Sequence, residues 1–131
     1  MLAKLIFPSI RMLPKLFVFD LDNCVWFPEM YQLWGGGSPF SQGKNGDLKD
    51  RSGERVYLMG DVRNIMTELK NDQKYKDCQV AIASRCDEPS WADECLDLFT
   101  INDGSKLGSV FSFKHIHKVS FFLLNSSRKQ I

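Results

Sequence analysis

The sequence predicts an α/β fold in which helices flank a parallel sheet. Two short apolar runs, Leu16 to Phe19 and Gln79 to Ala83, each end on polar side chains, and a helical pattern precedes and follows the second run. Strand alternating with helix is typical of parallel sheets. The first run has no polar alternation, which predicts a strand buried on both faces. The 131 residues suit one hydrophobic core, so we expect a flexible extension over 1–14 and a single domain over 15–131.

The composition argues against several classes of protein. A formal net charge of +1 argues against nucleic-acid binding and against a polybasic membrane anchor. No apolar run approaches the roughly 20 residues that span a bilayer. Four cysteines without a C-x-x-C pair predict free thiols and a cytoplasmic protein. The basic first fifteen residues leave organelle targeting open as an alternative. The oligomeric state stays undetermined.

A glycine-rich insert, about 27–59, follows the first strand, and we name it the flap. The stretch "WGGGSPFSQGKNGD" has the composition of loops. The stretch "LKDRSGERVYL" predicts a β-hairpin with its turn at Ser52-Gly53. No G-K-[ST] sequence follows Gly35 to Ser38, so we interpret the flap as mobile rather than as a phosphate-binding loop.

Two amphipathic helices are predicted, one from Gly60 to Asp72 and one from Glu88 to Phe99. Asp61 is a plausible N-cap of the first, and Pro89 suits the first turn of the second. The apolar residues of each helix fall on one face: Val62, Ile65, Met66 and Leu69 in the first, and Trp91, Cys95, Leu98 and Phe99 in the second. Two apolar runs follow, Val110 to Phe113 and Val119 to Leu124, with no obvious helix between them.

Polar side chains stand where the two buried strands end. Asp20 and Asp22 follow the first strand, and Ser84 ends the second. The carboxyl ends of parallel strands meet at one edge of a sheet, where ligands gather. Paired carboxylates suit Mg²⁺; with the metal bound, Asp20 could act as a nucleophile while Asp22 transfers protons. Ser84 could donate to a phosphoryl oxygen, so these residues predict phosphoryl transfer.

The motifs "FVFDLDNCVW" and "VAIASR" resemble the first two motifs of the haloacid dehalogenase (HAD) superfamily, and more closely the small magnesium-dependent phosphatase-1 family. The tryptophan after the first motif, the flap and the "LDLF" helix end also fit, over roughly Leu16 to Phe113. The resemblance implies a HAD-like Rossmannoid fold without a large cap domain and Mg²⁺-dependent hydrolysis of phosphomonoesters. It implies a phosphorylated small molecule, such as a sugar phosphate, or a phosphotyrosine protein as substrate.

The resemblance also implies roles for single residues. Asp20 would be the nucleophile that forms an aspartyl-phosphate and a ligand of Mg²⁺. Asp22 would be the general acid/base, with its backbone carbonyl on the metal. Ser84 would hold a phosphate oxygen, and Arg85 would either face the substrate or remain a solvated surface arginine. The lysine of the third motif is best matched by Lys118, ahead of Lys114 and Lys106.

The sequence departs from the family in two places. Cys24 stands where the family has threonine, and we expect it to be a small buried packing residue. Leu123 and Leu124 stand where the fourth motif has an acidic pair, and the C-terminal third diverges as if the fold were incomplete there. Leucine cannot bind Mg²⁺. The alternative hypothesis is therefore a catalytically impaired, truncated isoform or pseudophosphatase that binds phosphate or regulates.

Two further groups of residues admit more than one interpretation. Trp26, Tyr31 and Trp34 could stack on an aromatic substrate or shield the flap. His115 and His117 alternate on a probable strand and so face the same side. They could bind a metal as a pair or form an ordinary polar strand face.

Overall fold

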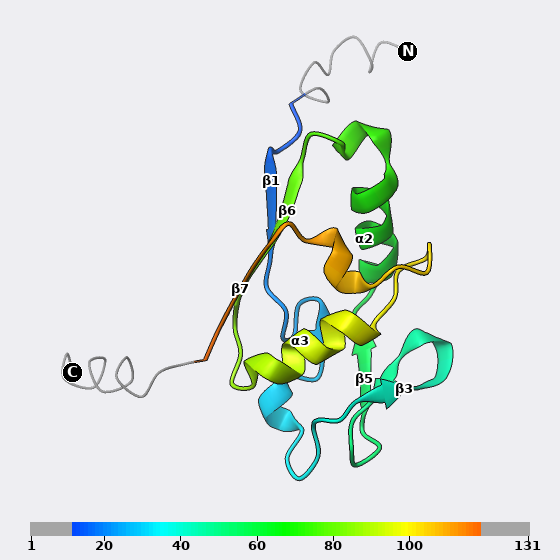
Figure 1. Ribbon diagram of the computed structural model, residues 1–131, viewed down its shortest axis with the longest axis vertical. Helices are drawn as coiled ribbons and strands as arrows, with labels where there is room; N and C mark the ends of the chain where they lie inside the picture. Colours follow the sequence, from blue (N-terminus) through cyan, green and yellow to red (C-terminus); the bar gives the residue numbers. More distant parts are fainter. Residues whose placement is uncertain (1–11, 119–131) are drawn as a thin grey trace, which may run out of the picture.

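Strands and helices alternate along the chain, and the computed structural model describes residues 12–118. The elements are β1 (Leu16–Phe19), β2 (Trp26–Phe27), β3 (Ser41–Gln42), β4 (Leu48–Lys49), β5 (Arg55–Leu58), α2 (Val62–Asn71), β6 (Gln79–Arg85), α3 (Pro89–Leu98) and β7 (Phe113–His117) (Figure 1). Most of the N-terminal extension and the run from Val119 to Leu124, with the pair Leu123 and Leu124, lie outside the described residues. Between residues 12 and 118, no helix is long and apolar enough to cross a membrane.

A three-stranded parallel sheet in the order β1-β6-β7 confirms the predicted α/β fold. The order advances in one direction, from β1 through α2 to β6 and from β6 through α3 to β7. Right-handed crossovers that advance in one direction place their helices on the same face of the sheet. The core lies on that face, where buried side chains of both helices meet those of β6.

β1 is partly buried on one face and exposed on the other, so the prediction of burial on both faces is wrong. The rings of Phe17 and Phe19 face the core and pack edge-on against Tyr75 and Phe111, with centroids 6.0 and 6.3 Å apart. Leu16 and Val18 point the opposite way and are 47% and 55% exposed. We attribute this exposure to the one-sided placement of the helices and to the position of β1 at the edge of the sheet formed by the described strands.

Both predicted helices are present, with one correction. Met66 and Leu69 of α2 are buried as expected, but Ile65 is 42% exposed. Ile65 borders a shallow apolar pocket beside Phe17 and Phe19, at the open edge of the sheet. Pro89 begins α3 as predicted.

The ends of the elements differ in detail from the predictions. Asp61 occupies the N-cap position of α2 without a side-chain capping bond and accepts instead from Asn64. The second buried strand extends to Arg85, so that Ser84 lies inside β6. The first C-terminal apolar run begins at the last residue of a short 3₁₀ turn, Leu107–Val110, and the strand begins only at Phe113, the last residue of the run.

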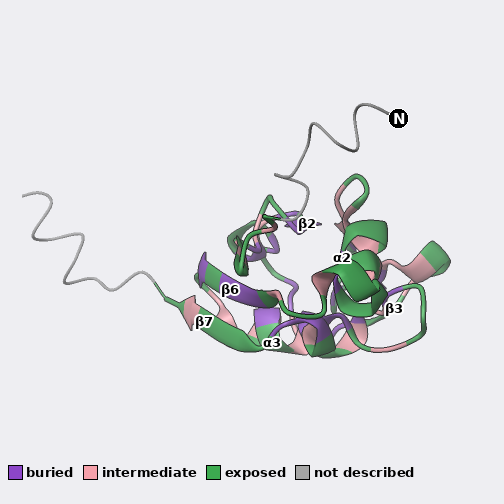
Figure 2. Ribbon diagram, turned by 90° about the horizontal axis from the view of Figure 1, so that it is seen from above, coloured by how far each residue is buried: buried purple, intermediate pink, exposed green. Residues whose placement is uncertain are grey.

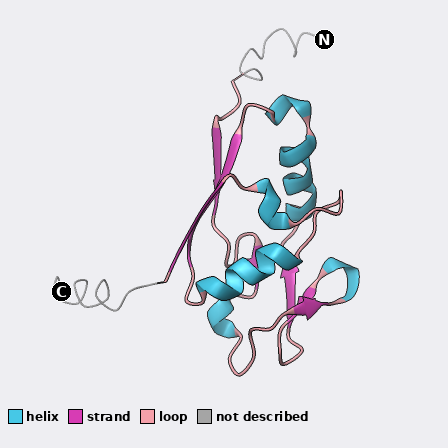
Figure 3. Cartoon of the chain, viewed as in Figure 1, coloured by secondary structure: helices cyan, strands magenta, loops and turns pink. Residues whose placement is uncertain are grey.

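The flap forms a second, antiparallel sheet in the order β2-β5-β4-β3. Figure 3 shows its short strands set apart from the parallel sheet. The predicted hairpin joins β4 to β5, and Gly53 in its turn has a φ of +91°, a value that glycine adopts without strain. Whether the flap moves remains a prediction.

The flap is organised around the buried carboxylate of Asp50. Its oxygens accept hydrogen bonds from the amides of Gly37, Ser52 and Glu54 at 2.8–2.9 Å and from the Ser52 hydroxyl at 2.7 Å. Burial by itself would raise the pKa of Asp50, but these hydrogen bonds outweigh it and hold the pKa below its ordinary value. The carboxylate therefore supplies acceptors for backbone amides of the flap.

The glycine run packs closely against this centre. A Cβ on Gly36 would lie 2.0 Å from Asp50 Oδ2, and one on Gly37 would lie 2.2 Å from the Trp91 ring. Close packing thus explains two of these glycines without any phosphate ligand.

Glu94 of α3 attaches the flap to the main domain. Its two carboxylate oxygens accept from the Ser38 hydroxyl at 2.6 Å and from the Phe40 amide at 2.7 Å. The side-chain amide of Gln42 donates to the carbonyl of Leu98 at 2.9 Å. These bonds hold the flap over α3, beside the strand ends.

We predict that Asp50→Asn lowers the free energy of unfolding by about 3 kcal/mol at pH 7, because an amide cannot accept from all these donors. The lowered pKa of Asp50 means that its contribution is complete above about pH 4 and is lost as the pH falls through the folded-state value. Urea unfolding at pH 7 and pH 3 should therefore show a smaller difference between variant and parent at the lower pH.

Asp97→Asn is the matched control, because Asp97 is exposed on α3. It should change the unfolding free energy little at either pH. A penalty for Asp50→Asn that stays constant with pH would contradict the assigned role of the charge.

Candidate active site

The two aspartates after β1 are separated by a buried leucine. Leu21 is fully buried in the core, while Asp20 is exposed and Asp22 partly buried. The carbonyl of Leu21 then accepts from the amides of Cys24 and Val25 at 3.1 and 2.8 Å, which closes a tight turn. Asn23 takes a φ of +57° in this turn, a conformation that asparagine tolerates better than most residues. Anchoring Leu21 thus leaves Asp20 exposed, while Asp22 stays partly buried beside the core.

Asp20 and Ser84 meet at the carboxyl ends of neighbouring strands. Ser84 Oγ donates to Asp20 Oδ1 at 2.6 Å, across 64 positions of sequence. The same Oδ1 accepts from the Leu21 amide at 2.8 Å. Among the described residues these bonds reach only Oδ1, so Oδ2 is available to a ligand.

Asp22 is held by the turn that follows it. Its Oδ1 accepts from the indole N–H of Trp26 at 2.8 Å, and its Oδ2 accepts from the amide of Met30 at 3.1 Å. Burial raises the pKa of Asp22, while the bonds from Trp26 and Met30 and the neighbouring Cys86 thiol lower it; the net pKa lies above the ordinary value. A carboxyl group with a raised pKa is suited to carry a proton.

A pocket of about 190 Å³ opens over these carboxylates. It is lined by Asp20, Asp22, Glu29, Tyr31, Arg85 and Asp87. Four acids thus face one guanidinium. The Glu29 carboxylate raises the pKa of Tyr31, which keeps that phenol neutral. An anion could enter such a pocket only with a cation beside it.

A second pocket, of about 300 Å³, adjoins the first and shares Tyr31 and Asp87 with it. Its further lining residues are Met30, Leu33, Trp34, Gly35, Glu88 and Trp91. Tyr31 is 49% exposed and Trp34 is 89% exposed. Two accessible aromatic rings therefore stand next to the acidic pocket.

The donors present are of the kind that Mg²⁺ prefers. Carboxylate oxygens dominate the acidic pocket, and Mg²⁺ commonly uses one or two protein carboxylates together with water and substrate phosphate. Residues 12–118 hold no group of three or more acid, histidine or cysteine side chains placed to enclose an ion. The described residues thus fit a partial, open magnesium site, in which Asp20 and Asp22 are the nearest donors.

Comparison with known proteins identifies the family. The sequence pattern of the family described as Acid Phosphatase matches residues 12–123. The chain belongs to the acid phosphatase family. A HAD-like hydrolase superfamily protein of Schizosaccharomyces pombe is 34% identical over 109 residues, which cover 79% of this chain and 58% of that protein. Human magnesium-dependent phosphatase 1 is 33% identical over 92 residues, 68% of this chain and 47% of that protein.

Membership confirms the resemblance to the HAD superfamily that the two strand-end motifs predict. The chain spans about half the length of the curated relatives it matches.

The structure brings together most of the residues predicted for the site. Asp20, Asp22 and Arg85 line one pocket, and Ser84 bonds to Asp20. Lys118 is exposed just after β7 and does not line this pocket, so its assignment as the third-motif lysine remains a prediction.

Sequence reasoning missed Glu29 and Asp87, which complete the acidic lining. The signal for Asp87 was its place two residues after Arg85, just past the end of β6. Glu29 carried no signal in the sequence, because it reaches the pocket only through the turn after β1, which brings it close to Asp20 and Asp22.

All four cysteines are free, as predicted. Cys24 is exposed, so the expectation of a small buried packing residue is wrong; the tight turn presents its side chain outward. Cys86 is buried next to Asp22. Burial, with the charge of Asp22, raises the pKa of Cys86 to about 12, so this thiol stays protonated and unreactive.

Trp26 belongs to the core. It is fully buried, stacks on Phe99 with centroids 6.0 Å apart and donates to Asp22. It neither contacts solvent nor lines either pocket, so of these three rings only Tyr31 and Trp34 border a pocket.

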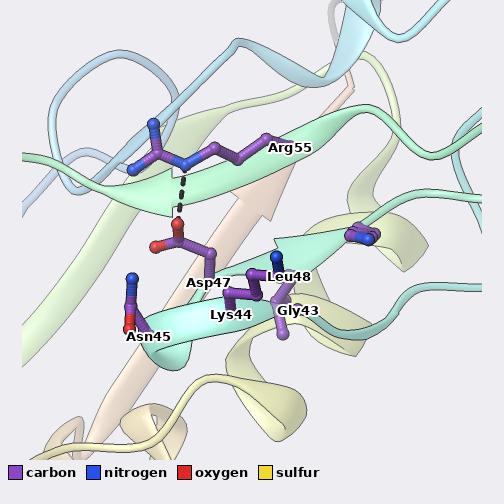
Figure 4. Close-up of a pocket in the computed structure, with 7 residues that line it drawn as sticks. Gly43, Lys44, Asn45, Asp47, Leu48 and Arg55 are labelled. Carbon is purple, nitrogen blue, oxygen red and sulfur yellow. Dashed lines mark hydrogen bonds and ion pairs between the residues drawn. The ribbon is translucent and has the colours of Figure 1, made fainter.

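A separate pocket of about 280 Å³ lies on the flap (Figure 4). Its cationic side chains are Lys44, Lys49 and Arg55, and Arg55 Nε already donates to Asp47 at 2.6 Å. A surface ion pair with neighbouring lysines is ordinary for a solvated hairpin, and the pocket contains none of the strand-end acids.

We predict that Trp26→Phe raises the carboxyl pKa of Asp22 in the metal-free chain. The variant removes a hydrogen bond that stabilises the ionised form, so the pKa must move further above the ordinary value. Titration of the Asp22 carboxyl carbon by NMR measures the shift.

Trp91→Phe provides the matched control, because Trp91 lines the aromatic pocket and makes no bond to Asp22. This variant should leave the carboxyl pKa of Asp22 unchanged. A downward shift in Trp26→Phe would contradict the role given to the indole N–H.

Proposed function

We propose that this chain is a Mg²⁺-dependent phosphomonoester hydrolase that acts through an aspartyl-phosphate on Asp20. The observation that carries the proposal is the 2.6 Å hydrogen bond from Ser84 to Asp20, which orients one carboxylate oxygen and leaves the other facing the acidic pocket. Membership of the acid phosphatase family supports the reaction class. The human relative is named magnesium-dependent phosphatase 1, which supports Mg²⁺ as the cofactor.

In the first half of the reaction, Asp20 Oδ2 attacks phosphorus and the bond from phosphorus to the leaving oxygen breaks. Asp22 donates its proton to that oxygen, which its raised pKa favours. Arg85 lines the same pocket as Asp20 and can donate to phosphoryl oxygens. The single proton of the Ser84 hydroxyl is donated to Asp20 Oδ1, so Ser84 can donate to a phosphoryl oxygen only when that bond breaks.

In the second half, Asp22 removes a proton from water and the resulting hydroxide attacks phosphorus. The bond from phosphorus to Asp20 breaks, which releases inorganic phosphate and restores both side chains. Mg²⁺, held by Asp20, by Asp22 and by water, would offset the negative charge of the acids and the phosphate.

The aromatic pocket supports an aromatic phosphomonoester, such as phosphotyrosine, over a sugar phosphate. Tyr31 and Trp34 offer flat apolar surfaces in the pocket that adjoins the acidic one. A sugar leaving group needs hydrogen-bond partners, and the uncharged side chains here are mainly apolar. The size of substrate that fits beside the flap decides whether the aromatic ring of the substrate belongs to a small molecule or to a protein.

We expect the purified chain to hydrolyse p-nitrophenyl phosphate with Mg²⁺ and to lose activity by roughly 10³-fold or more in Asp20→Asn, since the nucleophile is removed. Release of inorganic phosphate measures turnover, and intact-mass analysis of trapped protein detects phosphate on Asp20. Asp97→Asn, the same change at an exposed site on α3, should retain full activity.

Equal activity of Asp20→Asn and the parent would contradict the aspartyl-phosphate mechanism. A folded parent chain that binds phosphate without any turnover would instead favour the pseudophosphatase hypothesis.

A second prediction concerns the leaving group. Trp34→Ala should lower kcat/KM for phenyl phosphate about tenfold, because one stacking surface is lost, and should change kcat/KM for glycerol 2-phosphate little. Trp34 is almost fully exposed, so its loss should not affect folding. Equal losses for both substrates would contradict an aromatic subsite.

A further inference from the structure

The chain contains only two histidines, and both lie on the exposed side of β7. The rings of His115 and His117 are in contact, with centroids 3.8 Å apart and planes at 88°. Figure 2 shows β7 mainly in the colours of exposed and partly exposed residues. The phosphatase reaction proposed above uses neither side chain.

Strand geometry explains why the rings meet. Residues two apart on a strand point to the same face, and the register pairs His115 with Ala83 and His117 with Arg85 of β6. This is the face that α2 and α3 leave uncovered, where Leu16 and Val18 are also exposed. The two rings border a hollow of about 280 Å³ whose other lining residues are Ala83, Ser84 and Arg85.

We propose that His115 and His117 together bind a transition-metal dication such as Zn²⁺ or Ni²⁺, at a site separate from the acidic pocket. Neutral imidazole is a preferred ligand of Zn²⁺, Ni²⁺ and Cu²⁺, whereas Mg²⁺ prefers oxygen. The two histidines offer nitrogen ligands and the aspartates offer oxygen ligands, so the two sites should prefer different metals. The strand places both imidazoles together before any metal arrives, and water fills the remaining coordination positions.

The surrounding charges set an upper limit on affinity. Arg85 lines the same hollow and opposes a cation, while Lys114 points to the other face by strand alternation. Two protein ligands are also fewer than the four of a closed structural zinc site. Binding should therefore be reversible and weaker than at such a site.

The two sites share one boundary residue. Arg85 lines both the acidic pocket and the histidine hollow. Magnesium in the acidic pocket and a transition metal on the histidines would thus both lie near the Arg85 side chain. The inference does not depend on phosphatase activity, because its test measures metal binding alone.

The test is isothermal titration of the full, untagged chain with NiCl₂, in saturating Mg²⁺ and a phosphine reductant. We expect one Ni²⁺ per chain. His115→Ala and His117→Ala should each weaken binding at least roughly tenfold, the lower end of the cost of losing even an outer-shell partner at known metal sites. Lys114→Ala, on the same strand, is the matched control and should bind like the parent.

Circular dichroism of each variant establishes that the fold is retained, which the exposure of both histidines favours. Absence of Ni²⁺ uptake by the parent chain would overturn the proposal. Uptake that persists in both histidine variants and is lost in Cys24→Ser would also overturn it, because it would assign the metal to the exposed thiol.

Discussion

The burial of Trp26 links the hydrophobic core to the chemistry of the strand ends. Its ring is fully buried and stacks on Phe99, so its indole N–H needs an acceptor inside the protein. Asp22 supplies that acceptor at 2.8 Å. Trp26 also pairs with Leu58 in the flap sheet. One side chain thereby connects the core, the flap and the Asp22 carboxylate.

The acidic pocket follows from that arrangement. Four carboxylates close to one guanidinium repel a phosphate dianion, so the pocket can take a phosphomonoester only when a cation is bound and Asp22 carries a proton. Burial raises the pKa of Asp22, which favours the second condition. The same acids that would repel the substrate are the oxygen ligands that attract Mg²⁺.

The one-sided sheet separates two kinds of chemistry. Ser84 donates to Asp20, and Arg85, the next residue of β6, pairs with His117; both residues also line the histidine hollow. The carboxylates and the imidazoles thus offer different ligand atoms in two neighbouring pockets that meet at Arg85. The flap, attached to α3 through Glu94, adds the aromatic rings on the acidic side only.

The sequence by itself determined the α/β class, both helices, the hairpin turn at Gly53 and the meeting of Asp20, Asp22 and Ser84. These depend on periodicity, turn chemistry and strand-end position, which are local or follow from the parallel sheet. Only the tertiary structure decided that Trp26 is buried while Trp34 is exposed, that Cys24 points outward and that Leu16 and Val18 face solvent. It also brought Glu29 and Asp87 into the pocket. Those outcomes depend on which face the helices cover and where a turn returns the chain, and neither is encoded in short stretches of sequence.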